Sequence, residues 1–258
     1  MDLGLQGKSI IVTGGLKGIG LACARLFVSE GARIGITSRS SANIEHACAE
    51  LGGVFGFAAD LTSADEAAAM VEAMESRLGP ADILVNCAGA ARRTPPDALT
   101  PAAWKSAMEA KFFTYIHVID PVVKRMAARG SGVIVNVIGN GGKVAAPIHL
   151  AGGAANAALM LTTAGLAAAY ARQGVRVVGL NPGLTNTERV AEGLRADAAL
   201  RGTSEQEALR QSLSRIPLGR MAEPEEIANA VVFLASAKAS YVTGVTITMD
   251  GAQTPVVI

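Results

Sequence analysis

Lys111 and Tyr115 stand four residues apart in a segment expected to be helical, which places both side chains on one face of the helix. A lysine next to a phenol favours the phenolate form, and the pair could therefore transfer protons. His149 is a second candidate for proton transfer, because an imidazole titrates near neutral pH. Asn140 could donate a hydrogen bond to a carbonyl oxygen. These residue types predict acid–base chemistry at a carbonyl or hydroxyl group.

The same four residues also have simpler interpretations, which the sequence leaves open. Lys111 could extend along the protein surface to reach solvent, and Tyr115 could belong to the core or to a subunit interface. His149 could be structural or solvated. Asn140 lies among glycines, where asparagine is a common turn residue.

A glycine-rich segment, TGGLKGIG at residues 13–20, follows the first β-branched run of the chain. Glycines at positions 14, 18 and 20 allow a tight turn, close approach of the backbone to a diphosphate, and close packing of a helix on a strand. The helix that follows would direct its unpaired N–H groups at the phosphates. A glycine-rich turn alone is a weak signal, but a preceding strand and a following helix are the context that a dinucleotide site requires. We therefore predict a dinucleotide-binding loop here.

The elements that must position these residues alternate along the chain. Short β-branched runs predict strands at residues 9–13, 33–37, 54–58, 83–86, 133–138, 176–180 and 245–249. Longer runs predict helices at residues 19–30, 63–78, 101–129, 152–172 and 224–235. This alternation predicts right-handed βαβ units and a parallel sheet, which is an α/β fold. No linker interrupts the pattern, so we expect a single domain over residues 1–258, in which the polar insertion at 187–220 is a candidate substrate lid.

The composition excludes several classes of protein. The formal net charge of +1 is too small for a protein that coats nucleic acid, and 50% hydrophobic residues exclude a disordered chain. Three cysteines far apart in sequence indicate neither a disulfide framework nor a metal site, and they favour a reducing, cytoplasmic location. The first residues lack the pattern of a signal peptide. Residues 144–171 carry no charge, but they are rich in alanine and glycine, so we expect a helix buried on all sides, for example at a subunit interface, rather than a membrane span.

The segment TGxxxGIG resembles the cofactor signature of the short-chain dehydrogenase/reductases. Further segments match that family in order: Asp60 after the third strand, NCAG at 86–89, NPG at 181–183 followed by Thr187, and YVTG at 241–244 before DG at 250–251. The resemblance covers the whole chain. It implies a Rossmann-type, doubly wound, three-layer α/β/α fold with seven parallel strands in the order 3-2-1-4-5-6-7, and a homodimer or homotetramer. The cofactor contacts that follow from the motifs are Gly14, Lys17, Gly18, Ile19, Gly20, Ser38, Arg39, Asp60, Leu61, Asn86, Ala88, Gly89, Pro182, Gly183, Thr185 and Thr187.

The end of the second strand indicates which cofactor is bound. Family members that prefer NAD(H) carry an acidic residue there, which binds the ribose hydroxyls. In this chain the position holds Ser38, followed by Arg39, and Lys17 can reach the same ribose. Two cations without a carboxylate favour a 2′-phosphate, so the resemblance implies NADP(H) rather than NAD(H). The alternative is that both cations are solvated surface charges.

The family's catalytic residues are the part of the pattern that the chain does not match. Standard members use an Asn on the helix after the fourth strand, a Ser after the fifth strand, and a Tyr-x-x-x-Lys pair on the next helix. No lysine of this chain follows a tyrosine at that spacing, and the four positions hold Lys111, Gly139, Gly152 and Asn156. Lys111 and Asn156 exchange the family's Asn and Lys, so the site would keep one cation and one amide. The candidate catalytic residues are Lys111, Tyr115, His149, Asn140 and Asn156.

Three functions remain open at this point. The first is an oxidoreductase that transfers hydride between NADP(H) and the carbonyl/alcohol group of a small molecule through a rearranged site. The second is a catalytically silent, cofactor-binding subunit of a hetero-oligomer, because all four family residues are replaced. The third is a non-redox lyase or isomerase with His149 or Lys111 as base. We expect the first, because the cofactor segments are intact, and we expect no nucleic-acid or membrane partner.

Overall fold

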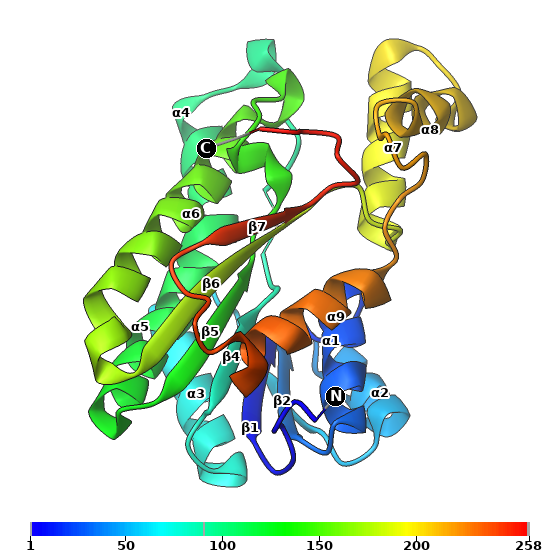
Figure 1. Ribbon diagram of the computed structural model, residues 1–258. Coiled ribbons are helices and arrows are strands. Elements are labelled where there is room, and N and C mark those ends of the chain that lie inside the picture. The colour runs from blue at the N-terminus through cyan, green and yellow to red at the C-terminus, as the bar shows by residue number, and fades with distance from the viewer. Residues whose placement is uncertain (1, 90, 257–258) are drawn as a thin grey trace.

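Seven parallel strands form one sheet at the centre of the protein. The computed structural model describes residues 2–89 and 91–256. The strands are β1 (Ser9–Thr13), β2 (Arg33–Ser38), β3 (Phe55–Ala58), β4 (Ile83–Asn86), β5 (Gly132–Val137), β6 (Val175–Pro182) and β7 (Thr246–Met249). They pair in the order β3-β2-β1-β4-β5-β6-β7, which confirms the predicted order (Figure 1). The strand order reverses between β1 and β4, and ligands of such sheets bind beyond the carboxyl ends of the strands at this point.

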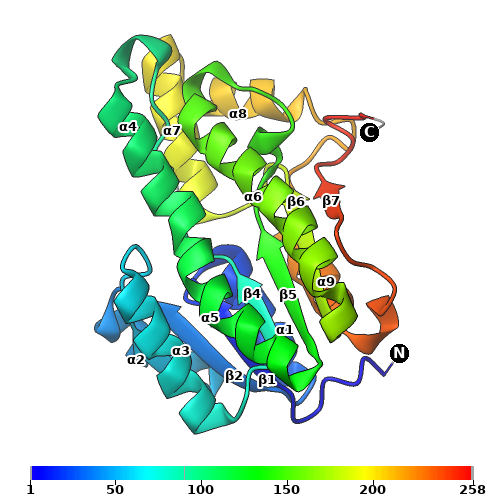
Figure 2. The same ribbon diagram turned by 90° about the vertical axis from the view of Figure 1, so that its left-hand side faces the viewer.

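Helices cover both faces of the sheet and complete three layers (Figure 2). One face carries α1 (Gly18–Ser29), α2 (Ser41–Leu51) and α9 (Pro224–Ala235), and the other carries α3 (Ala64–Leu78), α5 (Thr114–Arg129) and α6 (Leu150–Tyr170).

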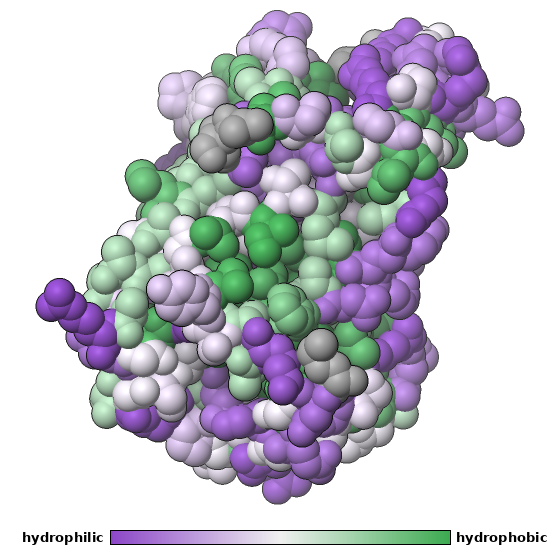
Figure 3. Space-filling view, viewed as in Figure 1, coloured by the Kyte–Doolittle hydropathy of each residue, from purple (hydrophilic) through white to green (hydrophobic). Residues whose placement is uncertain are grey.

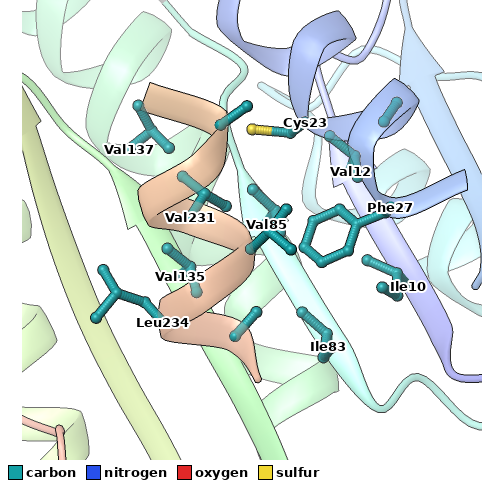
Figure 4. Close-up of a cluster of buried hydrophobic side chains, with 14 of the residues drawn as sticks. Ile10, Val12, Cys23, Phe27, Ile83, Val85, Val135, Val137, Val231 and Leu234 are labelled. Carbon is teal, nitrogen blue, oxygen red and sulfur yellow. The ribbon is translucent and has the colours of Figure 1, made fainter. Parts of the chain in front are cut away.

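Each face of the sheet has its own hydrophobic core. Successive residues of a strand point to opposite faces, so Ile10 belongs to the first core and Ile11 to the second. Figure 4 shows the first core, where Phe27 of α1 and Val231 of α9 point toward Val85 of the sheet. Burial on both faces explains why the strands are apolar throughout rather than alternating.

The predicted strands are all present, with ends that differ by no more than two residues. The sequence pattern missed α2, which follows β2 directly. The side chain of Ser40 caps this helix by accepting a hydrogen bond from the N–H of Asn43 at 3.3 Å. Its buried residues are Ile44 and Ala47, a stripe too short to produce a clear helical period.

The prediction of one continuous helix over residues 101–129 is wrong. The structure has α4 (Pro101–Ala107), then a π-helical stretch at Met108–Phe113, and then α5. A π-helical turn inserts a residue into the regular spacing and is common at functional sites. The stretch carries Lys111, which it turns toward the interior.

The uncharged segment, residues 144–171, includes all of α6, and Pro147–Gln173 is long and apolar enough to cross a membrane, with a mean hydropathy of 1.3. The helix packs on the sheet through residues such as Ala155 and Leu159, as a core helix does. Leu161 on its other side is 77% exposed. The predicted burial on all sides therefore does not hold within a single chain.

The insertion after β6 consists of two helices, α7 (Glu188–Arg201) and α8 (Glu205–Leu213). Both lie beyond the carboxyl ends of the strands (Figure 1). Thr187 caps α7 by accepting a hydrogen bond from the N–H of Val190 at 3.4 Å. This placement puts α7 over the edge of the sheet at which ligands bind.

Candidate active site

The glycine loop between β1 and α1 leaves no room for side chains. A Cβ at Gly20 would lie 2.2 Å from the carbonyl oxygen of Gly14, and a Cβ at Gly14 would lie 3.0 Å from the backbone of Ala88. Gly14 and Gly18 also adopt positive φ angles, 67° and 53°. Close packing of the loop on both α1 and the end of β4 therefore requires glycine, as the sequence predicts.

The amino end of α1 fits a diphosphate group. Its N-cap residue, Lys17, provides no side-chain acceptor for the first turn, whereas α2, α3 and α7 all begin with a capping hydroxyl. Backbone N–H groups without such a partner are the usual phosphate ligands at helix ends. Thr187 lies over this loop, because a Cβ at Gly18 would be 3.1 Å from its methyl carbon.

The segment after β6 is held in place by its own hydroxyl groups. Thr185 donates a hydrogen bond to the carbonyl of Gly183 at 3.3 Å, and Thr187 donates to the carbonyl of Thr185 at 3.3 Å. Pro182, the last residue of β6, and Gly183 lie next to β7, where the N–H of Gly183 donates to Met249 at 2.8 Å. The predicted cofactor segment after β6 thus meets the end of β7, a segment far from it in the sequence, at one edge of the sheet.

The predicted phosphate-binding cations differ in their surroundings. Ser38 ends β2 and exposed Arg39 follows it. The carboxylate of Asp60 accepts hydrogen bonds from the N–H and hydroxyl of Thr62 at 3.0 and 2.8 Å, which lowers its pKa, and Arg39 lowers it slightly further. The Nζ of Lys17 lies 3.5 Å from Glu188 on α7, and both side chains are exposed. Such a pair contributes about 0–1 kcal/mol, so a phosphate can compete for Lys17.

Two of the predicted cofactor contacts are turned into the protein. The amide of Asn86 donates to the Oδ1 of Asn136 at 2.9 Å, and Asn136 donates in turn to Thr163 at 3.0 Å. Asn86 is fully buried, so this network joins β4, β5 and α6 and leaves its side chain unavailable to a ligand. The side chain of Leu61 is buried too, and its carbonyl accepts the Nδ1–H of His117 at 3.0 Å.

The remaining predicted contacts act through packing. Ile19 is half-buried against the first core. Ala88 donates its N–H to the hydroxyl of Thr13 at 3.1 Å. Gly89 has a φ of 96°, and a Cβ there would lie 2.6 Å from the carbonyl oxygen of Ala110. The chain after β4 therefore runs directly against the π-helical stretch.

Lys111 and Tyr115 share one helix face, as predicted, and both are buried, so Lys111 does not reach solvent. Lys111 donates to the Oη of Tyr115 at 2.8 Å, and both groups donate to the carbonyl of Val137, at 3.3 and 2.5 Å respectively. Burial lowers the pKa of Lys111 to about 7, and it raises the pKa of Tyr115 well above its usual value. The predicted phenolate is therefore wrong, because desolvation outweighs the nearby lysine and the phenol keeps its proton.

His149 fills the space in front of Gly152. A Cβ at Gly152 would lie 2.1 Å from the Cε1 of the imidazole, and a Cβ at Gly141 would lie 2.9 Å from its Cδ2. The Nδ1 atom is buried and has no hydrogen-bond partner in the described part of the chain. Burial lowers the pKa of His149, and three nearby cations lower it further. The imidazole is therefore neutral at physiological pH, with a ring nitrogen available for hydrogen bonding.

Asn140, just after β5, and Asn156, on α6, already make hydrogen bonds within the protein. The amide of Asn140 donates to Asp250 at 2.8 Å and to Thr254 at 2.9 Å. Both of its N–H groups are used, so the prediction that Asn140 donates to a substrate carbonyl is wrong in this arrangement. The amide of buried Asn156 donates to the carbonyl of Gly139 at 3.4 Å.

Three of the five predicted catalytic residues therefore converge on one place. Lys111 and Asn156 donate to two carbonyls two residues apart, one at the end of β5 and one just beyond it, and the charge of Lys111 acts on His149. Tyr115 accepts a hydrogen bond from Lys111, and Asn140 donates to the C-terminal segment. The arrangement combines a neutral imidazole with a lysine whose pKa is near 7, and both groups are suited to proton transfer.

Comparisons with known proteins agree with this architecture. A family model described as enoyl-(acyl carrier protein) reductase matches residues 14–254. D-threitol dehydrogenase from Mycolicibacterium smegmatis is 35% identical over 260 residues, which span 98% of this chain and 95% of that protein. The chain belongs to the short-chain dehydrogenase/reductase family.

Two solved structures that are similar to this family member contain NADPH. L-sorbose reductase from Gluconobacter frateurii, complexed with NADPH and L-sorbose, matches 100% of both chains with a TM-score of 0.92 and 30% identity. An NADPH-bound short-chain oxidoreductase from Pseudomonas aeruginosa PAO1, described as containing an atypical catalytic center, matches 98% of this chain and 99% of that chain, with a TM-score of 0.88 and 31% identity.

Two arginines near the site were not recognised from the sequence of this short-chain dehydrogenase/reductase. Arg93 lies on the loop after β4 and Arg189 lies in the first turn of α7, and the positive charges of both lower the pKa of His149. Neither arginine belongs to a motif or a regular spacing. Only the folded chain brings them together.

Proposed function

We propose that this chain is an NADP(H)-dependent oxidoreductase that interconverts an alcohol and a carbonyl group, with His149 as the acid–base residue. The observation that carries the proposal is the imidazole in the space in front of Gly152, the position at which the family resemblance expects a tyrosine. D-threitol dehydrogenase and L-sorbose reductase are named for an alcohol and a carbonyl substrate, which supports this reaction class.

The residues of the glycine loop would hold the cofactor, which supplies or accepts hydride when it is bound. The N–H groups at the start of α1 would bind the diphosphate, and the Pro182–Thr187 stretch would cover it. The positive φ angles and absent side chains of Gly14 and Gly18 allow the backbone to approach the phosphates closely.

The proton transfer is assigned to His149. A neutral imidazole can accept the proton of a hydroxyl group during alcohol oxidation and return it during carbonyl reduction. Lys111, with a pKa of about 7, adds partial positive charge on the same side and favours the developing alkoxide. Asn156 acts as a positioning residue, because its amide is bonded to Gly139.

NADP(H) is preferred over NAD(H) in this proposal. The position after β2 holds Ser38 and Arg39 rather than a carboxylate, and Lys17 is exposed at the loop. Both cations can bind a 2′-phosphate once Lys17 leaves Glu188. The structures bound to NADPH named above support the same preference.

We further propose that the chain self-associates as a homodimer or homotetramer and that α7 and α8 act as a substrate lid. Figure 3 shows hydrophobic residues gathered where Figure 1 draws β7. Val245, Ile247 and Phe233 are 46%, 38% and 42% exposed. Exposed apolar residues that cluster in this way favour an interface, and light scattering would measure the mass. A single domain and a cytoplasmic location stay predictions.

The decisive experiment separates cofactor binding from turnover. NADPH fluorescence would be titrated with the protein, and a panel of carbonyl compounds would then be screened for NADPH oxidation. The proposal expects binding and turnover, and it expects H149Q to keep NADPH binding while turnover falls by at least ~100-fold. Binding without turnover across the panel would instead support a silent cofactor-binding subunit. Full turnover by H149Q would exclude His149 as the acid–base residue.

A further inference from the structure

Arg93 and Arg189 lie on the same side of α7, although they come from different segments. The guanidinium of Arg93 packs on Gly193, since a Cβ there would lie 3.3 Å from its Cζ and 3.4 Å from its Nη2. Arg189 precedes Gly193 by one helical turn, so it belongs to the same helix face. Gly193 provides the space for Arg93, because a larger side chain would displace the guanidinium.

The same loop is tied to the turn that carries His149. The N–H of Thr94 donates to the carbonyl of Ile148 at 3.0 Å. Arg93 and His149 each adjoin one of these bonded residues, so the backbone fixes them next to each other. His149 thus lies among three other basic residues from three further segments. The positive charges of Arg93, Arg189 and Lys111 all act on it.

This cluster of positive charge is not neutralised by ion pairs within the described residues. No carboxylate there lies within 4.0 Å of a nitrogen of Arg93 or Arg189, whereas Arg125 and Arg220 each pair with a glutamate. Among the described groups that act most strongly on Arg189, Glu192 is the one carboxylate, and Tyr115, which keeps its proton, carries no charge. Like charges held together destabilise the fold unless an anion joins them.

We propose that this site takes a substrate whose alcohol or carbonyl group is accompanied by a carboxylate, and that Arg93 and Arg189 bind this carboxylate. The proposal rests on the proposed function for the reacting group, but the anion site itself rests on the arginine geometry. A guanidinium binds a carboxylate through two parallel hydrogen bonds, which fixes orientation as well as charge. With the carboxylate held at α7, the reacting carbon of a small hydroxy or keto acid lies toward His149.

The test uses ligands that cannot react, so that it is independent of turnover. Cyclohexanecarboxylate and cyclohexanecarboxamide have the same shape and differ in charge. Their binding would be measured by isothermal titration calorimetry, with and without NADPH. The proposal expects the carboxylate to bind at least ~10-fold more tightly than the amide, an advantage that R93Q and R189Q each remove.

The matched control is R195Q, because Arg195 is an exposed arginine of the same helix without an ion pair among the described residues. This control should bind both probes as the unchanged protein does. Equal binding of the two probes, or failure of both to bind, overturns the proposal, and so does a loss with R195Q as large as that with R189Q. If the carboxylate binds through the arginines and no hydroxy or keto acid is turned over, the anion site stands and the proposed reaction fails.

Discussion

The carboxyl edge of the sheet has two halves that are built in different ways. Around β1 and β4, the geometry depends on backbone and on absent side chains, since Gly14 and Gly20 fit only because they lack a Cβ. Around β5 and β6, it depends on side chains that fill space left by glycine, as His149 does in front of Gly152. The glycine loop of the first half is recognisable from a sequence motif. The packing of the second half is recognisable only from the structure, which shows both residues of each contact.

This difference teaches that the second half is packed as a unit, in which each glycine is matched to one neighbouring side chain. The glycine at position 152 makes room for the imidazole, and a Cβ at Gly139 would lie 3.3 Å from the amide nitrogen of Asn156. Lys111 adds positive charge beside the same imidazole. A change at any one of these residues would disturb its neighbours, because together they form one packed arrangement.

The largest expected effect comes from the first half. In Gly20→Ala the new methyl group would meet a backbone carbonyl that cannot move aside, so the loop must distort. We expect NADPH affinity to fall by at least ~100-fold, measured by fluorescence titration. Gly165→Ala is the matched control, because nothing lies within 4 Å of the new group, and it should leave affinity unchanged. Normal NADPH binding by Gly20→Ala would contradict the assigned loop.

A comparable substitution in the second half should affect only turnover. In Gly152→Ala the methyl group would displace the imidazole of His149 while the glycine loop stays intact. We expect kcat to fall by ~100-fold and NADPH affinity to stay the same. Steady-state kinetics and fluorescence titration separate these outcomes. If kcat were unchanged, the position of the imidazole would be irrelevant to catalysis.

The buried lysine should make stability depend on pH. Burial lowers the pKa of Lys111 from 10.5 to about 7, so between these values the unfolded chain binds a proton that the folded chain does not. The free energy of unfolding should therefore rise with pH through this window. Lys111→Met should remove the dependence and raise stability at neutral pH by about 1–3 kcal/mol. Urea unfolding across the window measures it, and parallel curves for the two proteins would argue against a neutral lysine.

The smallest effect is expected where the two halves meet. Glu188→Gln on α7 removes the exposed ion pair with Lys17 and leaves this cation free for a 2′-phosphate. Since such a pair contributes about 0–1 kcal/mol, NADPH affinity should rise by only about two-fold and NADH affinity should not change. Parallel titrations with both cofactors measure the ratio, and an equal gain for NADH would show that Lys17 does not act on the 2′-phosphate.

Sequence patterns predict local features of this protein well and side-chain roles poorly. They place the seven strands and the glycine loop, because β-branched runs and glycine spacing act over a few residues. They miss α2, whose buried stripe is too short, and they do not reveal the π-helical stretch that turns Lys111 inward. They also assign Asn140 to a substrate, but the C-terminal segment, more than a hundred residues away in sequence, takes both of its donors.

By itself, the sequence determined the strands, the parallel sheet and the loop suited to a dinucleotide, since each depends on backbone preferences that neighbouring residues express, whereas the strand order followed from the family resemblance. The tertiary structure alone decided that Tyr115 keeps its proton, that the pKa of Lys111 falls to about 7, and that the charges of Arg93 and Arg189 act on His149. The physical reason is that burial and charge at one atom are set by segments from every part of the chain, and no single stretch of sequence contains that information.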